Sequence, residues 1–120
     1  MEIIRASERP SSLGTTFTGK VTQERILSGQ GDNSMSISVV HFENGARTTL
    51  HAHPGEQVLY ILEGEGRVGT ETEQHLVFPG DVVREGPGVT HWHGAVAGKN
   101  MTHITVTTVG SPEWYGPPEE

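Results

Sequence analysis

Five polar side chains of the kind that bind metal ions stand at short spacing in two parts of the chain. His51 and His53 lie one residue apart in the segment HAHPGEQ, and Gln57 follows four residues after the second histidine. His91 and His93 repeat the one-residue spacing in the segment THWHG. The chain has no cysteine, which excludes thiolate metal sites and disulfides. Imidazole suits manganese, iron, cobalt, nickel, copper and zinc, so binding of a divalent transition metal is the chemistry that this pattern favours.

Alternation along extended strands would turn these imidazoles toward one interior space. Residues two apart in a strand point the same way, so the two histidines of each HxH pair share a face. His103 lies in the segment MTHITV, whose alternation turns it toward the same interior. If the turn at 54–56 closes a hairpin, Gln57 opens the next strand beside His53 and points the same way. A metal ion would satisfy several buried imidazoles at once, since they would otherwise need other polar partners.

Short β-branched segments separated by turn residues make up most of the chain, and almost none has helical periodicity. This pattern predicts an all-β fold, a small antiparallel β-barrel or jelly roll. Segment 67–78 is expected to be a hairpin with its turn near Thr70–Glu73. The other expected strands, each bounded by turn residues, cover 15–27, 34–43, 46–53, 57–64, 82–85, 90–96 and 101–109.

The length of 120 residues predicts one domain over 1–120, with its core at about 15–110 and a Pro-rich acidic tail at 111–120. The net charge of −7 argues against nucleic acid or an anionic membrane as a partner. The first residues contain no apolar segment of the signal-peptide type, and no apolar run approaches the ~20 residues of a membrane span. We therefore expect a soluble, cytoplasmic protein.

Two motifs resemble those of the cupins. The first, G-x5-H-x-H-x3-4-E-x6-G, is matched with every spacing kept at Gly45, His51, His53, Gln57 and Gly64, where Gln57 replaces the usual glutamate. The second, G-x5-P-x-G-x2-H, is matched at Gly80, Gly88 and His91, with the proline displaced by one position to Pro87. The resemblance implies the cupin barrel and a metal site held by residues of both motifs.

A closer similarity links the segments FTGKV, ENGARTTLHAHPGEQ, HWHGA and MTHI to the small bacterial cupins that include the manganese-dependent hydroxynitrile lyases. This resemblance implies that the metal ligands are His51, His53, Gln57 and His91, and that His103 is catalytic. It favours Mn²⁺, with Fe, Ni, Co or Zn as alternatives. His93 is expected in the pocket or next to the ligands, and the inward-facing Ser38 and Val40 are expected to shape the pocket.

The expected ligands are all neutral, so a divalent ion there would keep its charge and stabilise a bound anion. This favours acid–base and C–C bond chemistry over oxygen activation, and the resemblance implies a lyase that splits cyanohydrins into a carbonyl compound and cyanide. A metal-dependent oxidoreductase or dioxygenase is the alternative, and a cupin that only binds a small ligand is the third hypothesis, because fold alone does not decide function. In each case a small molecule is the expected partner.

A homodimer is also expected. Small barrels leave exposed edge strands, and the N-terminal segment MEIIRAS contains β-branched residues that would allow it to pair with a neighbouring chain. The cupin resemblance points the same way.

Overall fold

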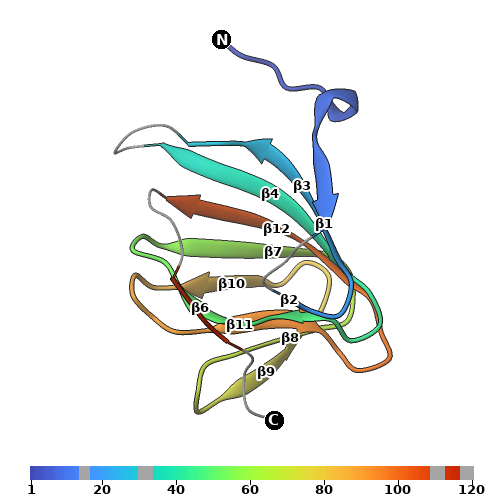
Figure 1. Cartoon of the computed structure of the whole chain (residues 1–120), viewed down its shortest axis with the longest axis vertical. Helices are drawn as coiled ribbons and strands as arrows, with labels where there is room; N and C mark the ends of the chain where they lie inside the picture. The colour runs from blue at the N-terminus through green and yellow to red at the C-terminus, as the bar shows by residue number, and fades with distance from the viewer. Residues whose placement is uncertain (14–16, 30–33, 109–112, 117–120) are drawn as a thin grey trace.

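The computed structural model of the chain describes residues 1–13, 17–29, 34–108 and 113–116. Strands make up almost all of its regular structure, as Figure 1 shows. Within the described residues, the only helical element is a single 3-10 turn, η1, at Ala6–Glu8. No helix among them is long and apolar enough to cross a membrane. The all-β fold expected from the short alternating segments is confirmed.

The larger sheet has six antiparallel strands in the order β1-β3-β4-β12-β7-β10. Alternation along β7 explains how this sheet buries one face, because Leu59 and Ile61 are fully buried while Tyr60 between them is exposed. Its strands, in this order, are β1 Ser11–Leu13, β3 Val21–Leu27, β4 Met35–Phe42, β12 Met101–Thr108, β7 Gln57–Gly64 and β10 Val82–Glu85.

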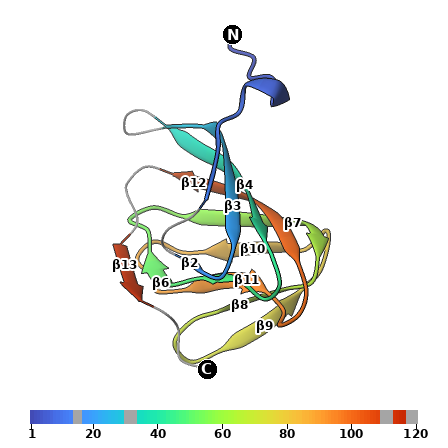
Figure 2. The same cartoon turned by 45° about the vertical axis from the view of Figure 1, so that its right-hand side comes forward.

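A smaller five-stranded sheet faces the first, and a two-stranded sheet closes one side between them (Figures 1 and 2). The five strands, in sheet order, are β2 Phe17–Thr18, β5 Arg47–Thr48, β11 Trp92–Ala95, β8 Gly66–Gly69 and β9 Gln74–Val77. The two strands are β6 Leu50–Ala52 and β13 Glu113–Gly116. The apolar core lies between the facing sheets, since Leu59 and Ile61 of the larger one cluster with Val68, Val77 and Ala95 of the smaller one.

The strand expected at 46–53 is interrupted at Thr49, because its two halves have different neighbours. β5 pairs with β11 and β2, whereas β6 pairs with β13. The hairpin expected at 67–78 is confirmed, since β8 pairs with β9 and the Thr70 amide donates to the Glu73 carbonyl at 2.9 Å. In the expected tail, only Glu113–Gly116 are described, while 111–112 and 117–120 lie outside the described residues.

The hairpin expected around residues 54–56 is wrong. β7 pairs with β12 and β10 and not with β6, so Gln57 does not lie across a ladder from His53. The His53 carbonyl instead accepts a hydrogen bond from the Gly88 amide at 2.8 Å. The chain therefore crosses from one sheet to the other between His53 and Gln57. The two side chains reach the interior from different sides of the barrel.

Candidate metal centre

Four buried imidazoles gather between the sheets, and they are called the histidine cluster below. They lie on or beside β6 and β11, the strands that carry the two HxH segments. Each of the four side chains exposes less than a tenth of its surface to solvent, and polar side chains buried this deeply normally have bonding partners. The cluster consists of His51, His53, His91 and His93.

Backbone pairing brings the two HxH segments together. The His51 amide donates to the His91 carbonyl at 2.9 Å, and the His91 amide donates to the His51 carbonyl at 2.8 Å. The two ring centroids are 4.2 Å apart as a result. One ring nitrogen from each of His51, His91 and His93 lies within 4.8 Å of the others, a spacing that a single metal ion could bridge.

Hydrogen bonds fix which nitrogen of two of these rings holds the proton. Nδ1 of His51 lies 2.8 Å from the Thr49 carbonyl, and Nδ1 of His91 lies 2.9 Å from the Val89 carbonyl. Because a carbonyl oxygen can only accept, we assign the proton of each neutral ring to Nδ1. The lone pair of each ring is then on Nε2, and a carbonyl behind the ring is the usual support of a metal-binding histidine.

Burial keeps these rings neutral. It lowers the pKa of His51 to about 3, and the neighbouring His91 lowers it further, against a raising contribution from the Thr49 carbonyl. Burial likewise lowers the pKa of His91 to about 4 and that of His53 below its ordinary value. For His93 burial lowers the pKa well below the ordinary value, with His103 and the other rings adding to the effect. Neutral imidazole is the form that coordinates a metal.

The remaining cluster nitrogens test whether the site fits a metal. Both ring nitrogens of His53 and Nε2 of His93 are buried without a hydrogen-bond partner among the described residues. Buried polar atoms are almost always paired, so these three atoms indicate a ligand that the protein itself does not provide. Nitrogen donors without thiolates suit a divalent transition metal, and the cluster therefore fits such an ion.

Gln57 reaches the cluster from the larger sheet. Its side-chain oxygen Oε1 lies 3.0 Å from Nε2 of His91, while its amide nitrogen donates to the Thr107 hydroxyl at 3.2 Å. That bond orients the amide so that the oxygen, the atom able to coordinate a metal, faces His91. Thr107 is opposite Gln57 on β12, and the sequence offered no signal for this supporting role.

Glu85 also belongs to this site, and the sequence analysis missed it. Its carboxylate oxygen Oε2 lies 3.2 Å from Nε2 of His91, and burial raises the pKa of Glu85 to about 8. The segment VVRE does contain a signal for it, because strand alternation places Glu85 on the same face as the core-packed Val83. Its opposite neighbour on β7 is Gln57.

His103 lies beside the cluster, on the interior side that strand alternation predicted. It is fully buried, and its Nε2 is 3.0 Å from Nδ1 of His93, so one imidazole separates it from the other rings. Its Nδ1 lies 3.1 Å from the Thr105 hydroxyl. Burial lowers its pKa to about 3, against a raising contribution from a hydrogen bond to its own backbone. Strand alternation correctly predicted that His103 points into the barrel, but it did not predict that His93 lies between His103 and the other rings.

The expected pocket residues, Ser38 and Val40, lie on β4, the strand that pairs with the strand of His103. Val40 is opposite His103 in the ladder and belongs to the apolar core, whereas Ser38 is half-buried opposite Thr105. Neither lines the cavity of about 270 Å³ that opens beside the cluster, which has His91 and Glu85 among its lining residues. This cavity is lined by residues of β8, β9 and β10, and neither His93 nor His103 is among them.

The cupin domain family matches residues 38–107, more than half of the chain and all of the cluster. The chain belongs to the cupin family. This cupin is 38% identical over 111 residues to an (R)-mandelonitrile lyase of Granulicella tundricola, a similarity that covers 88% of the chain and 83% of the relative.

Solved structures agree with the assignment. The cupin superposes on a cupin-like protein of Thermotoga maritima with a TM-score of 0.83 and 35% identity, covering 88% of this chain and 85% of that one. It also superposes on a predicted oxalate decarboxylase of the same organism with a TM-score of 0.78, covering 91% of this chain and 100% of that one. The identity to the second protein is 22%, so that similarity shows the fold alone.

Proposed function

We propose that this cupin is a metal-dependent lyase that cleaves cyanohydrins into a carbonyl compound and cyanide. The observation that carries the proposal is the 38% identity to a mandelonitrile lyase over 88% of the chain. The buried, neutral imidazole cluster supports it, because such donors suit the metal that the chemistry requires.

The proposed ligands are His51, His53, Gln57 and His91, with Mn²⁺ favoured over Fe, Ni, Co or Zn. His93, which has a ring nitrogen within 4.8 Å of those of His51 and His91, is proposed instead as a neighbour of the ion that accepts a proton. His51 and His91 are supported by their carbonyl-bonded rings, and Gln57 by the oxygen that it turns toward His91. His53 is supported by a buried ring whose two nitrogens have no partner within the described part of the chain. A divalent ion held there supplies Lewis acidity toward an alkoxide or cyanide.

We propose that the proton of the substrate hydroxyl passes to His93, with His103 behind it. The two hydrogen bonds support this direction in one pair of tautomers. In that pair His93 donates from Nδ1 to Nε2 of His103, and His103 donates from Nδ1 to the Thr105 hydroxyl. Nε2 of His93 then carries the lone pair and can take the proton. The electron pair of the O–H bond forms the carbonyl, and the pair of the broken C–C bond leaves with cyanide.

A direct test is the release of benzaldehyde from mandelonitrile, followed in parallel with an oxygen electrode. We expect protein loaded with Mn²⁺ to release the aldehyde without oxygen uptake, and metal-stripped protein to lose most of this rate. Oxygen uptake coupled to turnover would instead identify an oxidoreductase. Binding of the nitrile without turnover would identify a ligand-binding cupin.

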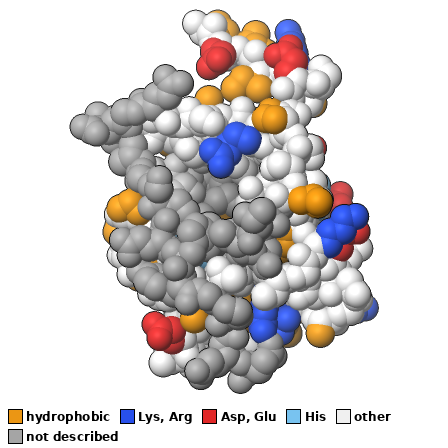
Figure 3. Space-filling view, in the orientation of Figure 1, with side chains coloured by type: hydrophobic (Ala, Val, Ile, Leu, Met, Phe, Trp, Pro, Cys, Tyr) orange, Lys and Arg blue, Asp and Glu red, His pale blue; other side chains and the backbone are white. Residues whose placement is uncertain are grey.

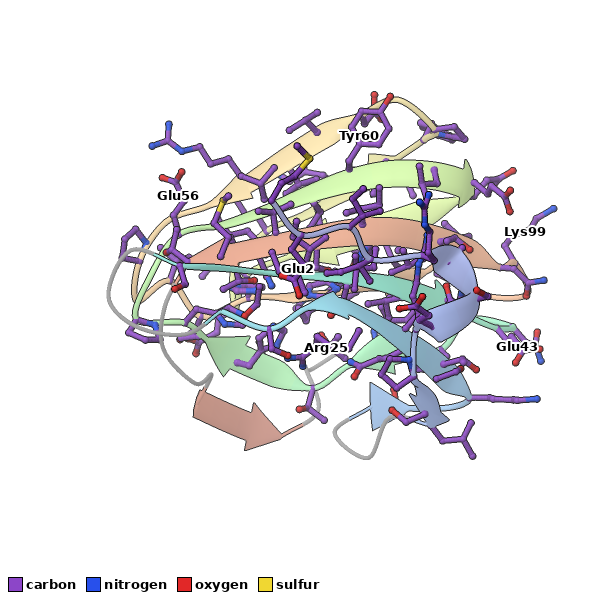
Figure 4. All side chains as sticks on the ribbon, turned by 90° about the horizontal axis from the view of Figure 1, so that it is seen from above. Glu2, Arg25, Glu43, Glu56, Tyr60 and Lys99 are labelled. Atoms are coloured by element: carbon purple, nitrogen blue, oxygen red, sulfur yellow. The ribbon has the colours of Figure 1, made fainter. Side chains whose placement is uncertain are left out.

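We also propose that the chain forms a homodimer. The N-terminal segment projects from the barrel with apolar side chains around it, as Figures 2 and 3 show, and Met1, Ile3 and Leu13 are exposed. It leads into β1, the edge strand of the larger sheet, where another chain can pair. The outer face of that sheet presents Tyr60 (Figure 4), and its ladder partner Val82 is also exposed.

Light scattering should therefore give the mass of two chains, and deletion of residues 1–10 should shift the protein toward monomer at low concentration. The variant Leu76→Ser is a matched control, because it removes an exposed apolar side chain from β9 of the smaller sheet and leaves both the N-terminal segment and β1 intact. A monomer mass that does not change with the concentration of the intact protein would contradict the proposal.

A further inference from the structure

Three hydrogen-bond acceptors converge at one point of the site. Nε2 of His91 lies 3.0 Å from Oε1 of Gln57 and 3.2 Å from Oε2 of Glu85. The proton of the neutral His91 ring is on Nδ1, where the Val89 carbonyl accepts it. When Glu85 is ionised, the nitrogen and both oxygens turn lone pairs toward one another, so either a proton or a metal cation has to lie between them.

The protein provides Glu85 with no such cation. Among the described residues, no lysine or arginine forms an ion pair with Glu85, and the adjacent Arg84 pairs with Glu56 at 2.7 Å instead. The second oxygen of Glu85, Oε1, is buried and has no hydrogen-bond partner in the described part of the chain. An ionised carboxylate that is this deeply buried is normally paired or bound to a metal.

Strand register gives this carboxylate a defined position. Glu85 of β10 and Gln57 of β7 are direct partners in the antiparallel ladder, so their side chains leave the sheet side by side on its inner face. Both reach the same nitrogen of His91, which belongs to the opposite side of the barrel. Glu85 is thus held where a ligand would have to be, by backbone pairing rather than by a mobile turn.

We infer that Glu85 is an anionic ligand of the metal, added to the site from β10 beside Gln57. The inference rests on the metal site proposed above and names one further ligand of that site. Carboxylate oxygen is a common ligand of divalent transition metals. Because the other proposed ligands are neutral, Glu85 would reduce the net charge of a divalent site from +2 to +1. That charge suits a neutral hydroxyl compound or a monoanion such as cyanide.

The test measures Co²⁺ affinity by competition with a chelator, together with the visible absorption of bound Co²⁺. Glu85→Gln keeps the size of the side chain and removes its charge. We expect it to weaken Co²⁺ binding by about 10²-fold or more, beyond the effect typical of residues that only orient a ligand, and to shift the absorption bands. The control Glu63→Gln removes the same charge from an exposed position on β7 and should leave affinity within about twofold, in the range of surface substitutions.

The outcomes separate this inference from the proposed function. If intact protein binds Co²⁺ and Glu85→Gln binds it equally well with unchanged bands, Glu85 is not a ligand while the metal site stands. If intact protein binds neither Co²⁺ nor Mn²⁺, the metal site itself is wrong and the inference fails with it. Thermal unfolding of metal-free Glu85→Gln excludes a folding defect, because the glutamine amide can donate to Nε2 of His91 in place of the carboxyl proton and should leave the melting temperature unchanged.

Discussion

Protein in which His51 or His91 is replaced by alanine should purify without metal and lose at least about 10³-fold in turnover, since Lewis-acid catalysis is worth several kcal/mol. Each ring supplies Nε2 to the same space, and each is held by a carbonyl on its other nitrogen. The two residues also pair through backbone atoms, which the substitutions leave intact. The loss should therefore be one of metal binding rather than of fold.

Metal analysis of protein without a histidine tag measures metal binding, and circular dichroism measures whether the fold is kept. His75→Ala is the matched control, because it removes an imidazole that is exposed on the hairpin and bonded only to the side chain of Glu73 among the described contacts. It should keep full metal content. One metal ion per chain in both the His51→Ala and the His91→Ala proteins would show that these residues are not the ligands.

His103→Ala should bind metal normally but lose about 10²–10⁴-fold in turnover, the usual contribution of a general base. The ring is fully buried, and its ring nitrogens bond to His93 and Thr105 rather than to Gln57 or Glu85, so the ligands should stay in position. Removing it leaves Nδ1 of His93 without its acceptor, and the hydroxyl proton then has no second imidazole to be shared with.

A second substitution separates proton acceptance from simple support of His93. The side-chain oxygen of His103→Gln can accept the hydrogen bond from Nδ1 of His93 but cannot take up its proton at neutral pH. If His103 shares the proton, both variants should lose rate and alter the pH dependence of kcat/KM. If glutamine restores the rate, His103 only orients His93. Loss of metal from either variant would require the ligand set to be redrawn.

Local patterns in the sequence predicted much of this molecule. Alternation alone turned both HxH pairs to the interior, and turn residues located the hairpin at 67–78. The hairpin expected at 54–56 failed because β7 finds its partners at long range, in β10 and β12, which no short turn signal reveals. The same cause hid the contact between Gln57 and His91.

Glu85 escaped notice for a related reason. A glutamate at the end of a short strand is normally solvated, so residue type outweighed the alternation that turned it inward. Only the register of β10 against β7 places it beside Gln57. The depth of His103 was equally out of reach, because periodicity tells which face a residue is on but not which ring stands in front of it.

The short strand β6 joins two parts of the chain that are far apart in sequence. On one side His51 exchanges hydrogen bonds with His91, and on the other β6 pairs with the C-terminal strand β13, where Trp114 is opposite His51. We therefore expect occupancy of the centre and pairing of β13 to be thermodynamically linked. An ion that binds the imidazoles should then stabilise the pairing of β13, and by reciprocity a chain without this strand should bind the ion more weakly.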